Sequence, residues 1–327
     1  MKKILITILL SAFAFGAFAG TFTITPKEQQ QITEEAEDWI DDMPEGLQDR
    51  LSDAVLHAMR GFSSEINSFR NYKDNSAPGQ YAVTVSDIKG GKDSSIGMRI
   101  YSGKKSDKSA KCPVLVYFHG GGWTMGSLNA TDRFCRALAS EGKVLVISVD
   151  YPLAPEYPYP SAINVGKNAV EFIYSKAAAW GGDNNRISLG GDGAGGNIAL
   201  AVYESLNPNM KIKSLVLYYP LLKTSGSLTD NLKRKYGRGY GFDSRLWEVY
   251  TTAYQGKDIV YKKTLPATLM LIPGRDIIYD VFIDFKSSHK SVECVEFSGA
   301  LHGFISDGHQ TTAFDKAVEI TNAFLTK

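Results

Sequence analysis

The sequence is short of cysteine and carries almost no excess of charge of either sign. Its 327 residues include three cysteines, and 36 lysines and arginines stand against 35 aspartates and glutamates. A formal net charge of +1 gives no field that would draw the chain to nucleic acid or to an anionic membrane. Cys112, Cys135 and Cys294 have neither CxxC nor Cys–His spacing, so they indicate no metal or redox site. At most one pair of them can form a disulfide, and buried small side chains are the simplest interpretation.

Long apolar runs are also lacking, except at the N-terminus. Lys2 and Lys3 precede an apolar stretch over residues 4–18, and Ala17-Phe18-Ala19 has the small-x-small form of a cleavage site. The stretch is shorter than the roughly 20 residues of a membrane helix. Residues 1–19 are therefore predicted to be a bacterial-type signal peptide that sends the protein to the periplasm or outside the cell, with an uncleaved anchor as the alternative. No membrane span is expected once the leader is removed.

Residues 27–69 have a helical pattern of apolar side chains. The apolar positions are Ile32, Ala36, Trp39, Ile40, Leu47, Leu51, Val55 and Met59. Pro44-Glu45-Gly46 interrupts the pattern, which predicts two helices. We expect residues 20–78 to form an N-terminal helical segment.

From residue 79 on, short runs rich in β-branched residues alternate with helical stretches. The expected strands are residues 81–88, 96–102, 114–118, 144–150, 187–190, 215–219, 268–272 and 292–297. Helices between successive strands act as crossovers, which favours a mostly parallel sheet. Residues 79–327 are therefore predicted to form one α/β domain.

Residues 222–255 do not fit this alternation, because they are polar and glycine-rich and then helical from Leu246 to Tyr254. Ligands of open α/β sheets bind beyond the carboxyl ends of the strands. We expect this insertion and the N-terminal helices to cover that end of the sheet as a helical cap.

A glycine-rich sequence, His119-Gly-Gly-Gly-Trp123, directly follows the strand expected at 114–118 and precedes a helix expected from Asn129. Consecutive glycines let the backbone turn sharply and present bare N–H groups to an oxyanion. Any tight loop could use such a glycine run, so the motif indicates an oxyanion site only together with its position between a strand and a helix and the other motifs of the chain.

Three further motifs follow in order: Asp150–Glu156 (DYPLAPE), Gly191–Asn197 (GDGAGGN) and His302-Gly303-Phe304. Together with the glycine-rich sequence they resemble the hormone-sensitive-lipase branch of the α/β-hydrolase family, a branch of carboxylesterases. The resemblance runs from about residue 81 to the C-terminus. It implies an α/β-hydrolase fold, in which helices flank a mostly parallel sheet and a helical cap lies over the site.

The resemblance also implies site residues around a glycine. In that family the block matching residues 191–197 reads G-D-S-A-G-G-N, so Gly193 takes the place of the nucleophilic serine. The backbone N–H groups of Gly121, Gly122 and Ala194 would line the oxyanion hole.

The other two catalytic positions implied by the family are Asp276 and His302. Asp276 matches the acid that orients the histidine, and His302 matches the general base, each in a loop after an expected strand. Asp280 is a less fitting acid because it lies a helical turn further on. Asp276 could instead cap the helix that starts near Ile278, and His302 could be an ordinary loop histidine.

A glycine at the nucleophile position leaves three interpretations. No other G-x-S-x-G occurs in the chain, and Ser188 precedes the turn. The protein is either a catalytically silent descendant that binds a ligand or partner, or a carboxylic ester hydrolase whose serine is substituted in this sequence. Residues 191–196 also satisfy the G-x-G-x-x-G of nucleotide binders, but the next strand ends in Tyr218-Tyr219-Pro220 without the acidic residue such sites need. We exclude that third interpretation.

The expected ligand is a small acyl-ester-like or hydrophobic molecule, the class on which the family acts. Trp123, Tyr151, Tyr157 and Tyr159 either line an aromatic pocket or pack under the cap, and packing is the simpler interpretation. The sequence calls for no metal, nucleotide or prosthetic group and carries no signal for an oligomeric state.

Overall fold

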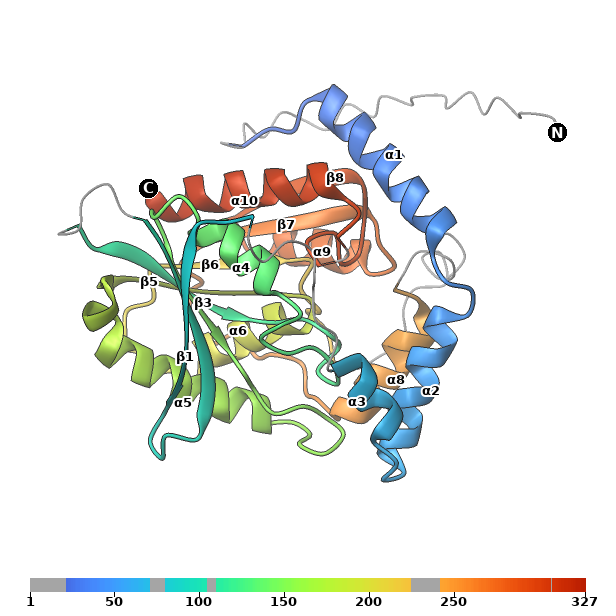
Figure 1. The fold of residues 1–327 in the computed structure, drawn as a ribbon, viewed down its shortest axis with the longest axis horizontal. Coiled ribbons are helices and arrows are strands. Elements are labelled where there is room, and N and C mark those ends of the chain that lie inside the picture. Colours follow the sequence, from blue (N-terminus) through green and yellow to red (C-terminus); the bar gives the residue numbers. More distant parts are fainter. Residues whose placement is uncertain (1–21, 71–79, 105–109, 225–241, 307) are drawn as a thin grey trace.

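A computed structural model describes residues 22–70, 80–104, 110–224, 242–306 and 308–327 (Figure 1). The leader at residues 1–19 and half of the predicted insertion, residues 225–241, lie outside the described residues. The leader and the domain boundaries therefore stay predictions. Among the helices that are described, none is both long and apolar enough to cross a membrane.

The centre of the molecule is an eight-stranded sheet in the order β1-β2-β4-β3-β5-β6-β7-β8. Its strands are β1 Val83–Gly90, β2 Ile96–Gly103, β3 Cys112–Phe118, β4 Leu145–Val149, β5 Gly182–Asp192, β6 Ser214–Tyr218, β7 Ala267–Arg275 and β8 Val292–Leu301. Strand β2 pairs antiparallel with β1 and β4, and the pairs from β4 to β8 are parallel. The predicted mostly parallel α/β sheet is confirmed.

Buried apolar strands and helices on both faces explain this architecture. Every residue of β3, β4 and β6 is buried, as expected for parallel strands covered on two sides. The helices are α1 Pro26–Asp42, α2 Leu47–Met59, α3 Ser64–Arg70, α4 Asp132–Ala139, α5 Ser161–Lys176, α6 Ala194–Ser205, α8 Ser244–Tyr254, α9 Tyr279–Ser288 and α10 Thr311–Thr326, with a 3-10 turn η1 at Ala177–Trp180. Helices α4 and α10 pack together on one face, and α5 and α6 on the other (Figure 1).

The N-terminal helices lie against the edge and the carboxyl end of the sheet. Helix α1 starts at a capping box between Thr25 and Glu28 and runs along β8. The Gln29 side chain bonds the edge of β8 twice, donating to Glu296 O at 2.9 Å and accepting from Ser298 N at 2.8 Å. This covers an otherwise unpaired strand edge. Helix α2 packs against α8 and α3, as the right-hand side of Figure 1 shows.

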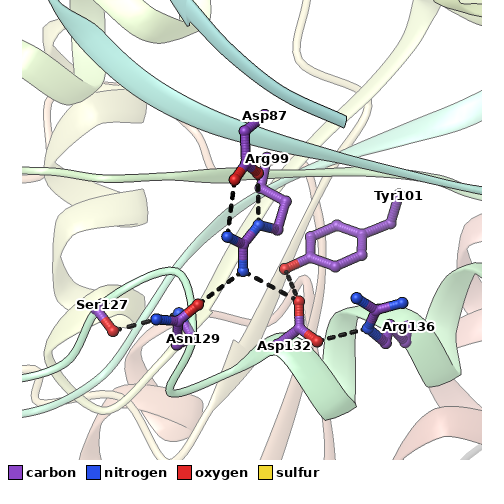
Figure 2. Close-up of polar contacts among 7 residues, drawn as sticks. All are labelled: Asp87, Arg99, Tyr101, Ser127, Asn129, Asp132 and Arg136. Atoms are coloured by element: carbon purple, nitrogen blue, oxygen red, sulfur yellow. Dashed lines mark hydrogen bonds and ion pairs between the residues drawn. The ribbon is translucent and has the colours of Figure 1, made fainter. Parts of the chain in front are cut away.

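Several predicted boundaries shift. Helix α4 begins at Asp132 and not at Asn129, because Asn129 belongs to the preceding turn: its N–H donates to Ser127 Oγ at 3.2 Å and its side chain accepts from Arg99 at 2.9 Å (Figure 2). Tyr219 lies beyond β6, with φ +35°. Strand β5 starts at Gly182, five residues before the predicted 187, because Gly182 already pairs with Cys112 of β3 across a register shift.

Arg99 ties the antiparallel end of the sheet to α4 (Figure 2). Its guanidinium binds Asp87 of β1 at 2.6 Å and Asp132 of α4 at 3.2 Å, and Tyr101 donates to the same Asp132 oxygen at 2.9 Å. The side chains of Arg99 and Asp132 are largely buried, and their ion pair gives each charge a partner in place of water.

All three cysteines are free. Cys112 and Cys135 are buried as expected, whereas Cys294 is only partly buried.

Arg70 at the end of α3 fastens the N-terminal helices to the loops at the carboxyl end of the sheet. Its guanidinium donates to Thr124 O and Ala154 O, both at 2.9 Å, and forms a two-pronged pair with Glu156. The Arg70 pair, with the Ser63 hydroxyl adding a further hydrogen bond, lowers the pKa of Glu156 to about 2.

This pair predicts acid-sensitive anchoring of α3. Because the pKa of folded Glu156 lies below its ordinary value of 4.5, ionised Glu156 stabilises the fold above that pH, and the contribution is lost as pH falls toward about 2. Urea unfolding of Glu156→Gln should show a lower stability at neutral pH and a shallower loss on acidification. Equal acid slopes in the variant and the native protein would contradict the assignment.

Candidate active site

Gly193 forms a sharp turn between β5 and α6. Strand β5 ends at Asp192 and α6 begins at Ala194, so Gly193 alone makes the turn, with φ 51° and ψ −115°. Its N–H donates to Tyr218 O and its carbonyl accepts from Leu221 N, both at 2.9 Å. This is the strand–turn–helix geometry of a nucleophile elbow. A Cβ placed on Gly193 would lie 3.6 Å from His302 Nε2.

His302 and Asp276 form a hydrogen-bonded pair beside this turn. They follow β8 and β7, and His302 Nδ1 lies 2.7 Å from Asp276 Oδ2. The Asp276 side chain is fully buried, and that of His302 is 14% exposed. An Nδ1–H that donates to the carboxylate leaves the lone pair of Nε2 directed at Gly193.

Asp276 orients the histidine and also bonds the turn that leads into α9, although it does not cap that helix. While Oδ2 faces His302, Oδ1 accepts the N–H of Ile278 at 3.0 Å, and Ile278 directly precedes α9. Asp280 is exposed in the first turn of α9. The structure thus brings Asp276, and not Asp280, to the histidine.

The glycine-rich loop after β3 lies on the other side of Gly193. Gly121 and Gly122 have φ of 110° and 58°, and Gly121 O accepts from Thr124 N and Met125 N in a tight turn. No hydrogen bond within the described residues uses the N–H of Gly121, Gly122 or Ala194. All three residues line the same cavity as Gly193, so these N–H groups can receive an oxyanion there.

Asp192 holds the loop and the turn together, a contact that the sequence analysis missed. Its Oδ1 accepts from Tyr117 OH at 2.7 Å and from Gly120 N at 2.9 Å. Burial raises the pKa of Asp192 to about 6, although both donors favour the ionised form. The available signal in the sequence was a carboxylate directly before the turn, at the end of β5.

His119 is a buried support and not a proton carrier. Burial lowers its pKa to about 4, so the ring is neutral at ordinary pH. Nδ1 lies 2.8 Å from Gly120 O, and the ring stacks on Tyr151 at 4.2 Å between centroids.

A cavity of about 250 Å³ opens over these groups. Its walls come from distant parts of the chain: Trp39, Leu47, Leu51, Gly121, Gly122, Asp192, Gly193, Ala194, Tyr219, Leu221, Phe242, Leu246, Tyr250, His302, Gly303 and Ser306. Helices α1, α2 and α8 therefore all contribute apolar side chains to it. The His302 ring lies against Phe242 and Tyr219, with centroids 4.4 and 4.8 Å away.

The aromatic residues singled out in the sequence pack elsewhere. Trp123 stacks on Tyr254 at 4.5 Å, Tyr159 meets the same ring edge-on, and Tyr157 is 59% exposed. Of these, and of Tyr151, none is among the described residues that line the cavity. The packing interpretation is right for Trp123, Tyr151 and Tyr159, whereas Tyr157 neither lines the cavity nor packs in the core.

The strand order, the turn at Gly193 and the histidine–aspartate pair after β7 and β8 define an α/β-hydrolase. A family model described as alpha/beta hydrolase fold matches residues 115–306. A probable carboxylesterase 6 of Arabidopsis thaliana is 37% identical over 276 residues, which cover 76% of this chain and 81% of the relative. This chain belongs to the hormone-sensitive-lipase-like branch of the α/β-hydrolase family, alongside carboxylesterases, as its motifs predicted.

Other similarities are shorter or concern the fold. The carboxylesterase NlhH of Mycobacterium tuberculosis is 44% identical over 119 residues, and the matched part spans only 37% of that relative and 36% of this chain. The crystal structure of carboxyl esterase 2 from Tuber melanosporum superposes with a TM-score of 0.72 at 19% identity, covering 93% of this chain and 99% of the other. At that identity the likeness establishes the fold alone.

Two neighbouring glycines should respond differently to substitution. A Cβ on Gly195 would lie 1.9 Å from Phe118 O, a backbone atom, so Gly195→Ala should lower the free energy of unfolding by more than about 4 kcal/mol. Gly193→Ala meets no close atom and should cost about 1–3 kcal/mol, for its positive φ alone. Urea unfolding compares the two, and equal costs would show that the approach of α6 to β3 is not tight.

Proposed function

We propose that this protein is a carboxylesterase-type ester-binding protein that lacks a nucleophile of its own. Its ligand is a short acyl ester or a small hydrophobic molecule of similar shape. The observation that carries the proposal is Gly193, which stands at the elbow with the Nε2 atom of His302 3.6 Å from the position of a Cβ.

Each retained group has a role in holding such a ligand. The N–H groups of Gly121, Gly122 and Ala194 receive the carbonyl oxygen, and His302, oriented by Asp276, faces the carbonyl carbon. Apolar side chains of α1, α2 and α8 surround the acyl and alcohol parts. A cavity of about 250 Å³ lies below the roughly 300–1,000 Å³ of pockets for drug-sized ligands, which favours short chains.

Hydrolysis by the usual covalent route requires a hydroxyl that Gly193 does not have. Ser188 is buried on β5, with its Oγ 2.7 Å from Ser214 Oγ. Ser306 lines the cavity, but its hydroxyl donates to Gly303 O at 3.0 Å and not to His302. Removing the serine from such a triad lowers turnover on the order of a millionfold.

The second candidate is an ester hydrolase whose serine has been substituted in this sequence. The 2.7 Å pair of His302 and Asp276 and the unused N–H groups favour it, because every group of the site other than the nucleophile is in place. The two candidates differ only in residue 193, so restoring the serine tests them together. Export through the leader at residues 1–19 remains part of the proposal.

Gly193→Ser should create esterase activity. With p-nitrophenyl acetate and butyrate, turnover should rise by up to about a millionfold over the native protein. The added activity should disappear in Gly193→Ser combined with His302→Gln. No activity in Gly193→Ser would contradict the assigned roles of His302, Asp276 and the oxyanion glycines. Rapid, His302-dependent hydrolysis by the native protein would contradict the silent interpretation.

Ligand binding by the native protein needs a separate test. Ethyl butyrate should bind saturably in calorimetry or saturation-transfer NMR, and Ser306→Trp should weaken binding by filling the cavity mouth. Ser287→Trp is the matched control, because Ser287 is also exposed and also donates its hydroxyl to the carbonyl three residues earlier. Equal binding by the two variants would place the ligand outside this cavity.

A further inference from the structure

We propose that the preferred ligand of the cavity is a short-chain carboxylate, and that His302 takes up a proton on Nε2 when this ligand binds. The proposal deepens the proposed function and rests on it, because it requires that the native chain holds an acyl compound in this cavity without reacting with it. It adds the charge of the ligand and a dependence of binding on pH.

The backbone donors of the cavity suit a negative oxygen. The N–H groups of Gly121, Gly122 and Ala194 line the cavity and make no hydrogen bond within the part of the chain that the structure describes. Ala194 is also the first residue of α6, where the helix dipole is positive. Hydrogen bonds to an ionised acceptor are roughly twice as strong as those between neutral groups. These N–H groups therefore favour a carboxylate over the carbonyl oxygen of an ester.

The second oxygen of the carboxylate meets Nε2 of His302. No hydrogen bond between described residues uses Nε2, whereas Nδ1 lies 2.7 Å from Asp276 Oδ2. In a neutral ring that donates from Nδ1, Nε2 has only a lone pair, so it cannot donate to a ligand oxygen. A protonated Nε2 becomes a donor, and a carboxylate oxygen accepts from it. The proton comes from the buffer, and no covalent bond of the ligand forms or breaks.

The separation of these donors fits a single carboxylate. Nε2 of His302 lies 3.6 Å from a Cβ placed on Gly193, and the nitrogen of Ala194 is two bonds from the Cα of Gly193. Ordinary bond lengths therefore keep Nε2 and Ala194 N within about 7.5 Å of each other. Two charge-assisted hydrogen bonds of about 2.8 Å, one to each oxygen, span up to this distance together with the width of the carboxylate. One carboxylate in the cavity can therefore bond both sides.

The charges of the bound state have opposite partners. A histidine–aspartate pair with oxyanion donors stabilises an imidazolium beside a negative oxygen, and in acyl transfer both charges are transient. A bound carboxylate supplies the negative oxygen permanently. The fully buried Asp276 carboxylate stabilises the imidazolium from the other side of the ring. This pairing offsets the cost of removing the ligand carboxylate from water.

Asp192 is the competing proton acceptor. Of the described residues that line the cavity, only Asp192 and His302 can carry a charge near neutral pH. Burial raises the pKa of Asp192 to about 6, whereas Tyr117, Gly120 and a protonated His302 favour its ionised form. Its Oδ1 accepts from Gly120 N, and a Cβ on Gly120 would lie 2.2 Å from its Oδ2, so both oxygens face Gly120. The test must therefore distinguish the two groups.

The other titratable groups near His302 are neutral or paired. Tyr219 and Tyr250 line the cavity with phenol rings, which carry no charge near neutral pH. Arg275, next to Asp276 in the chain, pairs with Glu37 of α1 at 2.7 Å. His309 is exposed and lies outside the cavity.

Calorimetric titration of the native protein with sodium butyrate tests the proposal. At pH 8, in two buffers of different ionisation enthalpy, binding should take up close to one proton. Between pH 7.5 and 9 the affinity should fall about tenfold per pH unit, because the bound state holds one proton more than the free state. Butyramide is neutral and has the same chain length. It should bind without proton uptake, and at pH 6.5 about tenfold more weakly than butyrate.

Variants assign the proton. His302→Gln should lose both the proton uptake and the pH dependence of butyrate binding. His289→Gln is the matched control and should keep both. His289 is also partly buried, lies against Phe285 and Tyr261 at 4.3 and 4.9 Å between centroids and uses Nδ1 in a hydrogen bond, but it does not line the cavity. Proton uptake that persists in His302→Gln would assign the proton to Asp192 and overturn the proposal.

Two results on the native protein alone would also overturn it, so the test holds even if His302→Gln does not fold. One is butyrate binding without proton uptake, and the other is butyrate binding no tighter than that of butyramide. Ethyl butyrate separates this failure from failure of the proposed function. If ethyl butyrate binds and butyrate does not, only the carboxylate preference is wrong, whereas absence of binding by both ligands removes the proposed function as well.

Discussion

The close approach of the first turn of α6 to the carboxyl end of β3 is the constraint on which the site depends. A Cβ on Gly195 would lie 1.9 Å from Phe118 O, and one on Gly191 would lie 2.2 Å from the same atom. Glycines at these places let the turn at Gly193 rest against the glycine-rich loop. Asp192 then fixes the loop through Gly120 N and Tyr117 OH. Without this contact the oxyanion N–H groups would not face the same space as Gly193.

Beside this contact the chain maintains a histidine–aspartate pair, with a glycine at the turn that faces it. The Asp276 carboxylate is fully buried, and an unpaired charge there would be costly. The N–H of Ile278 and the ring of His302 each bond one of its two oxygens, so both oxygens of the buried carboxylate have a partner. The pair can therefore be maintained in a chain that has glycine at position 193.

The N-terminal helices take part in the site through two kinds of contact. Trp39, Leu47 and Leu51 supply apolar wall, while Arg70 binds the carbonyl of Thr124 in the glycine-rich loop. These residues precede the part of the chain matched by the family model. The shape of the cavity thus depends partly on a segment outside the matched residues.

The sequence by itself determined the sheet and the identity of the central site residues. The strands are short apolar runs bounded by turn residues, a local pattern, and Gly193, Asp276 and His302 each sit directly after one of them. Only the tertiary structure decided what surrounds them. Asp192 bonds Gly120, and Arg70 bonds Thr124, across long stretches of the chain. Trp39 and Phe242 line the same cavity, although they are about 200 residues apart. Local periodicity cannot specify such contacts, because they depend on how whole elements pack. The same packing buries Trp123 and Tyr151 in the core, away from the cavity.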